Sequence, residues 1–222
     1  VFNLGFKKYD YKDITAEFAR KKNTLHLVLN SLDNNANLSA KVNVKDFDGQ
    51  RPQYNLESTI KKFSPNALNL SKTYSNTDFS AQLDAVFTGK DYRDFEGNVN
   101  MSDILITKPD TAINLGSLAL NSRKVRKGKI FALKGDFGKA EINGNFNFGR
   151  LAQDFLNVVN PMENKTRRAS DENVFDFNMH LKDAAIINLL TNTDIKVEGE
   201  NFLYGSIDSR NNFFQLELSV PN

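Results

Sequence analysis

Apolar and polar side chains alternate along most of this chain with a period of two residues. Successive side chains of a β-strand point to opposite faces, so this period predicts strands with one apolar and one polar face. The clearest case is 79–88, where Leu83 and its alternate neighbours are apolar while Gln82 and Asp84 are polar. Strands are expected over residues 14–19, 25–29, 38–44, 54–60, 67–70, 79–88, 95–101, 104–107, 113–120, 130–133, 140–148, 175–182, 195–197, 202–207 and 214–220.

Short turn sequences separate several of these strands. Residues 108–110, 127–128 and 135–136 contain the proline, glycine and aspartate that tight connections need. Short hairpins join antiparallel neighbours, so the sheet is expected to be a meander. The period changes at 150–159, which predicts a short amphipathic helix, and Asp183 is a candidate N-cap for a second helix.

The sequence therefore predicts an all-β fold with one or two short helices. Twisted open sheets rarely exceed about ten strands without curling or splitting into two layers. We expect a large antiparallel sheet that curls into an open trough, formed by a single elongated domain over residues 1–222. The alternative is a closed β-sandwich, in which two sheets bury each other's apolar faces. Because both ends of the chain continue the β pattern, we expect it to belong to a much longer protein.

Charge and composition narrow the function. The 29 basic and 27 acidic residues leave a net charge of +2, which does not favour nucleic acid as a partner. The chain has no cysteine, and His26 and His180 lie on the solvated polar faces of predicted strands without a second histidine at ligand spacing. We therefore expect neither a metal nor another cofactor. Residues 136–138 read Asp-Phe-Gly but lack the other kinase motifs, and we do not expect an enzyme.

One local excess of charge lies between two predicted strands. It contains Arg123, Lys124, Arg126 and Lys127, which are candidates for contacts with anionic lipid head groups. The simpler interpretation is a solvated hairpin tip, whose charges discourage aggregation at the sheet edge.

Four stretches of the chain follow each other in a pattern of turns, strands and one helix. They are residues 78–89, 95–101, 135–146 leading into 151–156, and 181–221. In this order they resemble the long periplasmic β proteins of the TamB and AsmA-like family, in particular the TamB type of Bacteroidetes-like bacteria. The resemblance lies in an ordered pattern and not in a chemical motif, so it transfers no single functional residue.

The resemblance implies a fold, a location and a role. Proteins of this family carry an N-terminal inner-membrane anchor and a long sheet curled into a groove, called a β-taco. They act in outer-membrane biogenesis, by moving phospholipid across the periplasm or by helping outer-membrane proteins assemble with an assembly barrel protein. The chain would be an internal periplasmic segment, tethered to the inner membrane in the full-length protein, with phospholipid acyl chains as its ligand.

An apolar groove needs no catalytic or charged group to hold acyl chains, because each buried CH₂ contributes about 0.8 kcal/mol. The functional residues are then the apolar faces of the strands. The alternative function is a closed sandwich that acts as a binding or adhesion module on the cell surface, with recognition in loops such as 160–173. We expect the groove to be lined by Phe79, Leu83, Phe87, Val99, Met101, Ile142, Phe146, Phe148, Phe175, Phe177, Met179, Phe214, Leu216 and Leu218.

Overall fold

The computed structural model describes most of the predicted strands. Every regular element among the described residues is a β-strand. The residues described are 2–72, 74–90, 94–147, 173–182, 201–211 and 213–219. The predictions that lie outside these residues are the helices at 150–159 and 183–190, the strand at 195–197, residues 160–172 of the predicted loop, and Phe148.

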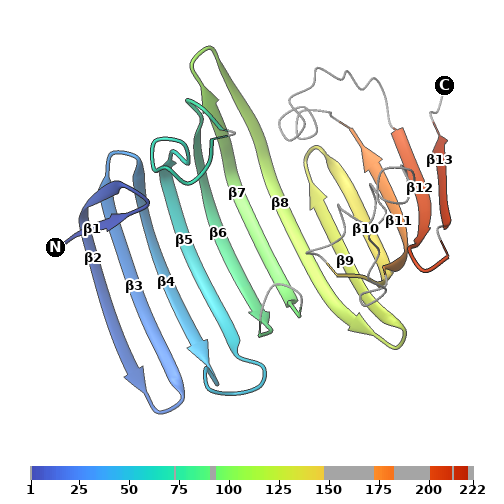
Figure 1. Ribbon diagram of the computed structural model, residues 1–222, viewed down its shortest axis with the longest axis horizontal. Coiled ribbons are helices and arrows are strands. Elements are labelled where there is room, and N and C mark those ends of the chain that lie inside the picture. The colour runs from blue at the N-terminus through green and yellow to red at the C-terminus, as the bar shows by residue number, and fades with distance from the viewer. Residues whose placement is uncertain are drawn as a thin grey trace. The chain divides into compact units, whose positions relative to one another are not determined.

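The described strands follow one another in the sheet in the order of the sequence (Figure 1). Paired strands are antiparallel, and β1 and β13 are the two ends of the order, so the sheet is not closed. The predicted large, open antiparallel sheet is confirmed, and the described strands do not form the two sheets of a sandwich. The strands are β1 (Phe2–Phe6), β2 (Tyr9–Lys21), β3 (Thr24–Asp33), β4 (Ala36–Lys45), β5 (Gln53–Phe63), β6 (Asp78–Thr88), β7 (Glu96–Lys108), β8 (Thr111–Val125), β9 (Gly128–Gly135), β10 (Gly138–Asn145), β11 (Val174–Leu181), β12 (Asn201–Asp208) and β13 (Phe213–Ser219).

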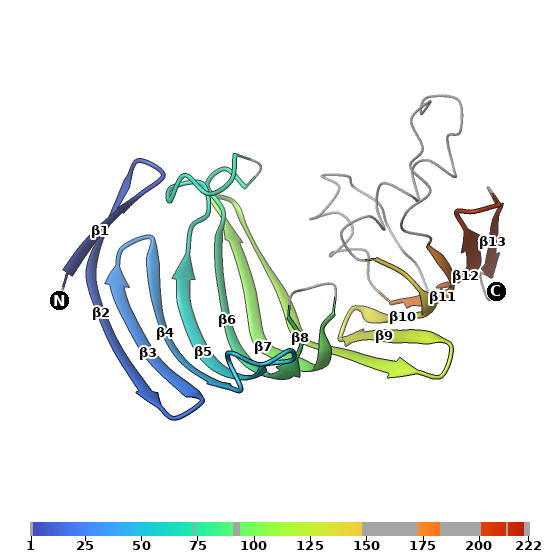
Figure 2. The same cartoon turned by 60° about the horizontal axis from the view of Figure 1, so that its bottom comes forward.

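The chain divides into two compact units, which we describe separately. Unit 1 contains Val1–Gly89 and Asn98–Ala119, and unit 2 contains Lys90–Gly97 and Leu120–Asn222. In unit 1, the strands β2 to β5 bend along their length (Figure 2). Within unit 1, the bent strands agree with the curled sheet that the sequence predicts.

Some strands are longer than the sequence predicts. β7 joins the two predicted strands 95–101 and 104–107, and β2 begins before the predicted strand 14–19. Asp103 in β7 and Asp13 in β2 both adopt a φ of 53°. Aspartate tolerates this left-handed conformation better than most residues. Each strand therefore continues past an irregularity that interrupts the alternation of its side chains.

The predicted strand at 67–70 is wrong, because these residues form turns. The amide of Leu68 donates to the carbonyl of Ser64 at 3.0 Å, and the amide of Leu70 donates to the carbonyl of Pro65 at 2.8 Å. These local hydrogen bonds satisfy backbone groups that a strand would pair with a neighbour. The alternation of apolar residues here reflects the full burial of Leu68 and not a sheet face.

These turns belong to a segment that we call the cap, residues 64–72 and 74–77, at one end of β5 and β6 (Figure 1). The ring of Tyr74 lies edge-on to the ring of Phe79, with centroids 5.5 Å apart. Asn69 donates from its side-chain nitrogen to the carbonyl of Lys8 at 3.3 Å. The cap therefore connects the β5–β6 end to the β1–β2 turn.

In unit 2, phenylalanine forms most of the core. Phe146, Phe175 and Ile207 are buried, and four partly buried side chains pack against them. The rings of Phe146 and Phe175 meet edge-to-face with centroids 6.0 Å apart, a favourable arrangement for two aromatic rings. The four side chains around this cluster are Phe131, Ile142, Phe177 and Phe214.

A glycine makes room for one of these rings. Gly205 in β12 lies directly opposite Phe177 in β11, so both occupy the same face of the sheet. A Cβ on Gly205 would lie 2.5 Å from Cζ of Phe177 and 2.5 Å from the carbonyl oxygen of Gln215. The Phe177 ring thus covers the backbone of β12, and only glycine is compatible with that contact.

Candidate functional site

Four rows of mainly apolar side chains cross the sheet of unit 1. Directly opposite residues of antiparallel strands share a face, so the register of β2 to β6 defines each row. The rows are Leu25, Val44, Tyr54 and Phe87; Phe18, Leu27, Val42, Leu56 and Ala85; Ala16, Leu29, Ala40, Ser58 and Leu83; and Ile14, Ser31, Leu38, Ile60 and Ala81. We call these residues the apolar face of unit 1.

The apolar face has little polarity. Ser58 directs its hydroxyl to the carbonyl of Ser39 at 2.8 Å, and the hydroxyl of Ser31 accepts from the amide of Asp33 at 3.4 Å. Arg20 is directly opposite Leu25, so the first row ends on β2 with a charged side chain. The rows themselves therefore present almost continuous hydrocarbon.

The opposite face of the same strands is polar. Lys41, Asn55, Glu57 and Asp84 alternate with the row residues and are exposed. His26 is also exposed there, and its Nδ1 lies 2.5 Å from Oδ1 of Asn43. The alternation predicted from the sequence thus separates the two faces of unit 1 as expected.

Most row residues are half-buried, although no second layer of strands or helices lies on them among the described residues. The aromatic rings of Tyr54 and Phe87 stack at one end of the face, with centroids 4.8 Å apart and an interplanar angle of 17°. At the other end the cap covers Phe79 through Tyr74. The half-burial arises from neighbours within the sheet and from the cap, and the middle of the face stays open within the described chain.

A buried carboxylate ties β2 to the β3–β4 turn at the cap end. Asp33 accepts from the Tyr9 hydroxyl at 2.7 Å, the Lys12 amide at 2.9 Å and the Asn35 amide at 2.8 Å. Burial by itself raises the pKa of Asp33, but the hydrogen bonds from Tyr9 and the backbone amides hold this pKa below its usual range. Burial and the same hydrogen bond raise the pKa of Tyr9. These hydrogen bonds hold β2 against the β3–β4 turn, at the cap end of the apolar face.

The predicted groove residues fall into two sets. Phe79, Leu83, Phe87, Val99 and Met101 belong to unit 1, and all five are half-buried. The others that the structure describes belong to unit 2, where they differ widely in burial. Buried there are Phe146 and Phe175; half-buried are Ile142, Phe177, Met179 and Phe214; exposed are Leu216, at 50%, and Leu218, at 63%.

The predicted basic cluster lies at the β8–β9 hairpin. Lys124 forms ion pairs with Asp94 at 3.3 Å and with Glu96 at 3.2 Å, so neighbouring carboxylates offset its charge. Arg123, Arg126 and Lys127 are exposed. Contact of this cluster with anionic head groups stays a prediction.

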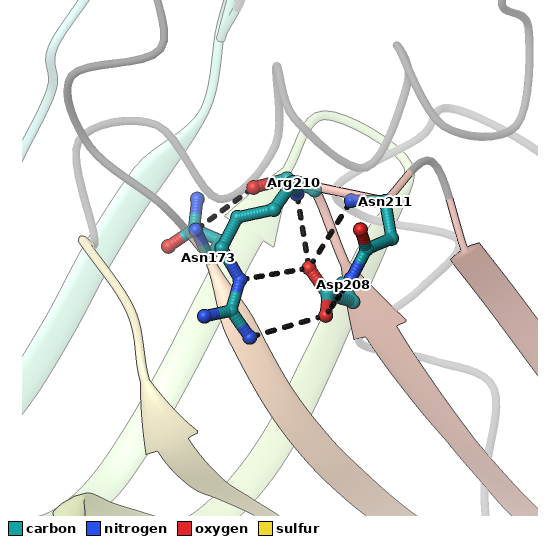
Figure 3. Close-up of polar contacts among 5 residues, drawn as sticks. Asn173, Asp208, Arg210 and Asn211 are labelled. Atoms are coloured by element: carbon teal, nitrogen blue, oxygen red, sulfur yellow. Dashed lines mark hydrogen bonds and ion pairs between the residues drawn. The ribbon is translucent and has the colours of Figure 1, made fainter.

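A second carboxylate organises the β12–β13 turn of unit 2 (Figure 3). Asp208 accepts from Nε of Arg210 at 3.1 Å, from the Arg210 amide at 3.0 Å and from Nδ2 of Asn211 at 3.0 Å. The Arg210 guanidinium, with these further donors, lowers the pKa of Asp208 to about 2. Asn173, which is fully buried, links the same turn to β11 by donating its amide to Ser209 at 2.9 Å.

The sequence predicts that His180 is solvated on the polar face of its strand, and this prediction is wrong. Its side chain is only 8% exposed and stacks on the ring of Phe202, with centroids 4.5 Å apart and an interplanar angle of 5°. Alternation placed His180 on the correct side of β11 but did not show that an aromatic neighbour on β12 covers it. The described residues contain no cluster of three groups able to hold a metal ion.

The sequence list of groove residues missed most of the apolar face of unit 1. Leu25, Leu27, Val42 and Leu56 are central in the rows, and their strands were predicted. The signal that could have identified these residues is the alternation of apolar and polar residues in β3, β4 and β5. The apolar residues of the three strands align in rows once the hairpin register is known.

No helix among the described residues is long and apolar enough to cross a membrane. Comparisons of the chain with protein-family models, with curated proteins and with solved structures find no match.

Proposed function

We propose that the apolar face of unit 1 binds the acyl chains of phospholipids, as one section of a path that carries lipid towards the outer membrane. The four rows carry this proposal, because they form a continuous apolar surface with no second layer of described residues on it. Large apolar surfaces of this kind mark sites that bind another molecule. In this proposal the segment lies in the periplasm and is tethered to the inner membrane through a longer protein of the TamB and AsmA-like type.

Acyl chains match the chemistry of the rows. They make no directional demands, and each CH₂ removed from water contributes about 0.8 kcal/mol. The five strands β2 to β6 lie about 4.8 Å apart, so the face extends for about 19 Å across them. Leucine, valine and isoleucine dominate its middle, and the hydroxyl of Ser58 is already bonded to the backbone. A ligand therefore meets mainly hydrocarbon across β2 to β6, with the charged Arg20 at the β2 end of the first row.

Lipid extraction and mass spectrometry of two matched variants test the proposal. Leu56→Asp adds a charge to the middle of the apolar face, and Asn55→Asp adds the same charge to the polar face of the same strand. We expect phospholipid to purify with the unmodified protein and with Asn55→Asp, and to be reduced at least about tenfold with Leu56→Asp, because a carboxylate on an apolar surface is costly to desolvate. Absence of lipid from the unmodified protein would overturn the proposal.

A crosslinking measurement covers the case in which Leu56→Asp fails to fold. A photoreactive phenylalanine analogue replaces Leu56 in one protein and Asn55 in the other, and each is illuminated with vesicles of phosphatidylethanolamine and phosphatidylglycerol. Lipid adducts are expected at position 56 and not at position 55. Equal labelling at both positions contradicts binding to the apolar face.

A further inference from the structure

The polar face of unit 2 is hollowed where four strands meet. A cavity of about 350 Å³ extends over β10 to β13. Its walls include Asn143, Asn178, Tyr204 and Gln215. A second cavity of about 330 Å³ shares Asn143 and Asp176 with the first, so the two form one continuous groove. The second cavity is also lined by Lys127, Val174 and Phe213. Four strands about 4.8 Å apart give this groove a width of about 14 Å.

An aromatic surface borders the groove. The rings of His180 and Phe202 are nearly parallel, and the ring of Phe202 is nearly parallel to that of Tyr204, with interplanar angles of 5° and 4°. Tyr204 is 44% exposed, whereas His180 is buried. The stacked rings hold Tyr204 in a fixed orientation, so that its accessible ring forms a wall of the groove.

Several other walls of the first cavity are planar hydrogen-bonding groups. Asn143, Asn178 and Gln215 each carry a carbonyl acceptor and two N–H donors, and these side chains are exposed. The carboxylate of Asp176 accepts from the Ser206 hydroxyl at 2.6 Å through one oxygen, which orients the group and leaves its second oxygen available as an acceptor. The groove thus combines an aromatic wall with both donors and acceptors.

We propose that this groove binds an oligosaccharide. The C–H face of a sugar ring packs against an aromatic ring, and its hydroxyls both donate and accept, which matches amides and carboxylates together. Glu141 and Glu217 also line the first cavity and disfavour an anionic ligand such as phosphate there. An acyl chain would leave the polar groups of the groove without hydrogen-bond partners.

This inference is independent of the proposed lipid function, because the groove lies in unit 2 and the apolar face lies in unit 1. Loss of either ligand in a variant of the other site is therefore not expected.

Calorimetric titration of the complete chain tests the proposal with defined probes: cellohexaose, laminarihexaose, maltohexaose, xylohexaose and, as a cationic competitor, spermidine. At least one hexasaccharide is expected to bind. Tyr204→Ala is expected to weaken that binding by at least about tenfold, and Tyr204→Phe by less, because the ring face is retained. Asn178→Ala is expected to weaken binding, and Asn55→Ala, on the polar face of unit 1, serves as its matched control.

Three results would overturn the proposal: no hexasaccharide binds, spermidine alone binds, or Tyr204→Ala binds a hexasaccharide as tightly as the unmodified protein. Because Tyr204 is already largely accessible, its removal is not expected to unfold unit 2. Thermal melting of each variant verifies this point. If Tyr204→Ala does unfold, Gln215→Ala, on the exposed edge strand β13, provides the same test of the groove.

Discussion

The apolar rows of unit 1 are mostly half-buried, whereas the centre of the phenylalanine cluster of unit 2 is buried. In unit 1 the row residues with the lowest exposure are small or lie at the margin, such as Ala81, Ala85 and Ile14. In unit 2 it is the large side chains Phe146 and Phe175 that are buried, at 6% and 7% exposure. The same period of two residues therefore leads to an open surface in one unit and to a core in the other.

Side-chain size and glycine explain this difference. Leucine and valine side chains are shorter than phenylalanine rings and cover less of a neighbouring strand, so most side chains of the unit 1 rows are only half-buried. Phenylalanine rings reach across strands, and Gly205 lets the ring of Phe177 lie against the backbone. In unit 2 the centre of the phenylalanine cluster is buried, although Leu216 and Leu218 of the same face stay exposed, whereas the large aliphatic side chains in the middle of the unit 1 rows are half-buried.

The largest expected effect is that of Phe175→Ala in unit 2. Removal of a buried ring leaves a cavity that the surrounding residues cannot fill, and we expect a loss of about 4 kcal/mol in the free energy of unfolding. Leu29→Ala, in the middle of a row in unit 1, is the matched change on the open face, and we expect it to cost about 1 kcal/mol. Urea denaturation followed by circular dichroism measures both. Similar losses would show that the unit 1 face is as well covered as the unit 2 core.

Gly205→Ala sharpens the comparison further. The added Cβ meets both the Phe177 ring and the carbonyl oxygen of Gln215 at 2.5 Å, so β12 and β13 must separate or the ring must move. We expect a loss of about 2 to 3 kcal/mol in the free energy of unfolding, as for other overpacked sites. The control is Ala40→Gly in a row of unit 1, which we expect to cost about 1 kcal/mol. A Gly205→Ala protein as stable as the parent would contradict the proposed closure by the ring.

Sequence reasoning predicts the strands and their two faces well, because side-chain direction follows directly from the period. Turn sequences also predict that strands joined by hairpins are neighbours, but the period does not predict the register between them. Leu27, Val42 and Leu56 form a row only because two hairpins set their register, and no single strand contains that information. The groove residues predicted from the sequence therefore include many phenylalanines but only Leu83 among the large aliphatic residues of the rows.

Contacts between neighbouring strands also determine whether a residue on the polar face is exposed, and the sequence pattern does not show these contacts. His180 and Phe202 lie on a face that alternation predicts to be solvated, yet their rings stack and bury the histidine. Likewise, the turn at 67–70 alternates like a strand, although Asn69 adopts a φ of 58°. Period alone does not distinguish a short strand from a turn that buries one leucine.

A smaller effect is expected for Asp33→Asn at the cap end of unit 1. The amide of asparagine places a donor where the Tyr9 hydroxyl and two backbone amides already donate, and we expect a loss of about 2 kcal/mol in the free energy of unfolding at pH 7. Because the pKa of Asp33 is lowered in the folded state, its contribution is present above the ordinary value of 3.8 and is lost as pH falls below it. Asp10→Asn, an exposed change on β2, is the control.

Denaturation of Asp33→Asn and of the parent protein at pH 7 and at pH 3 tests whether the ionised form of Asp33 stabilises the fold through this network. The difference between Asp33→Asn and the parent is expected to shrink at the lower pH, since pH 3 lies below the ordinary pKa of 3.8 and the carboxyl group of the unfolded parent is then mostly protonated. A difference that stays constant with pH would show that the ionised carboxylate does not hold the end of the open face. Lipid binding is expected to weaken only slightly, because Asp33 lies beyond the middle of the rows.

The smallest expected effect concerns Asp208 at the β12–β13 turn of unit 2. Its pKa of about 2 lies below the ordinary value of 3.8, so the carboxylate stabilises the fold above pH 3.8, and this contribution is lost as pH falls through 2. Asp208→Asn is expected to cost about 1 kcal/mol at pH 6, as for an ion pair near the surface, and almost nothing at pH 2.

Arg210→Gln separates the ion pair from the backbone hydrogen bonds of the same turn. Without the guanidinium, which lowers the Asp208 pKa most, the stability of the protein is expected to become less dependent on pH between 4 and 2. The phenylalanine cluster contains no titrating group, so it keeps unit 2 folded while the turn loosens. If protonation of Asp208 instead unfolds unit 2 completely, the closure of that unit depends on its turns and not on its rings, and the contrast with unit 1 has a different cause.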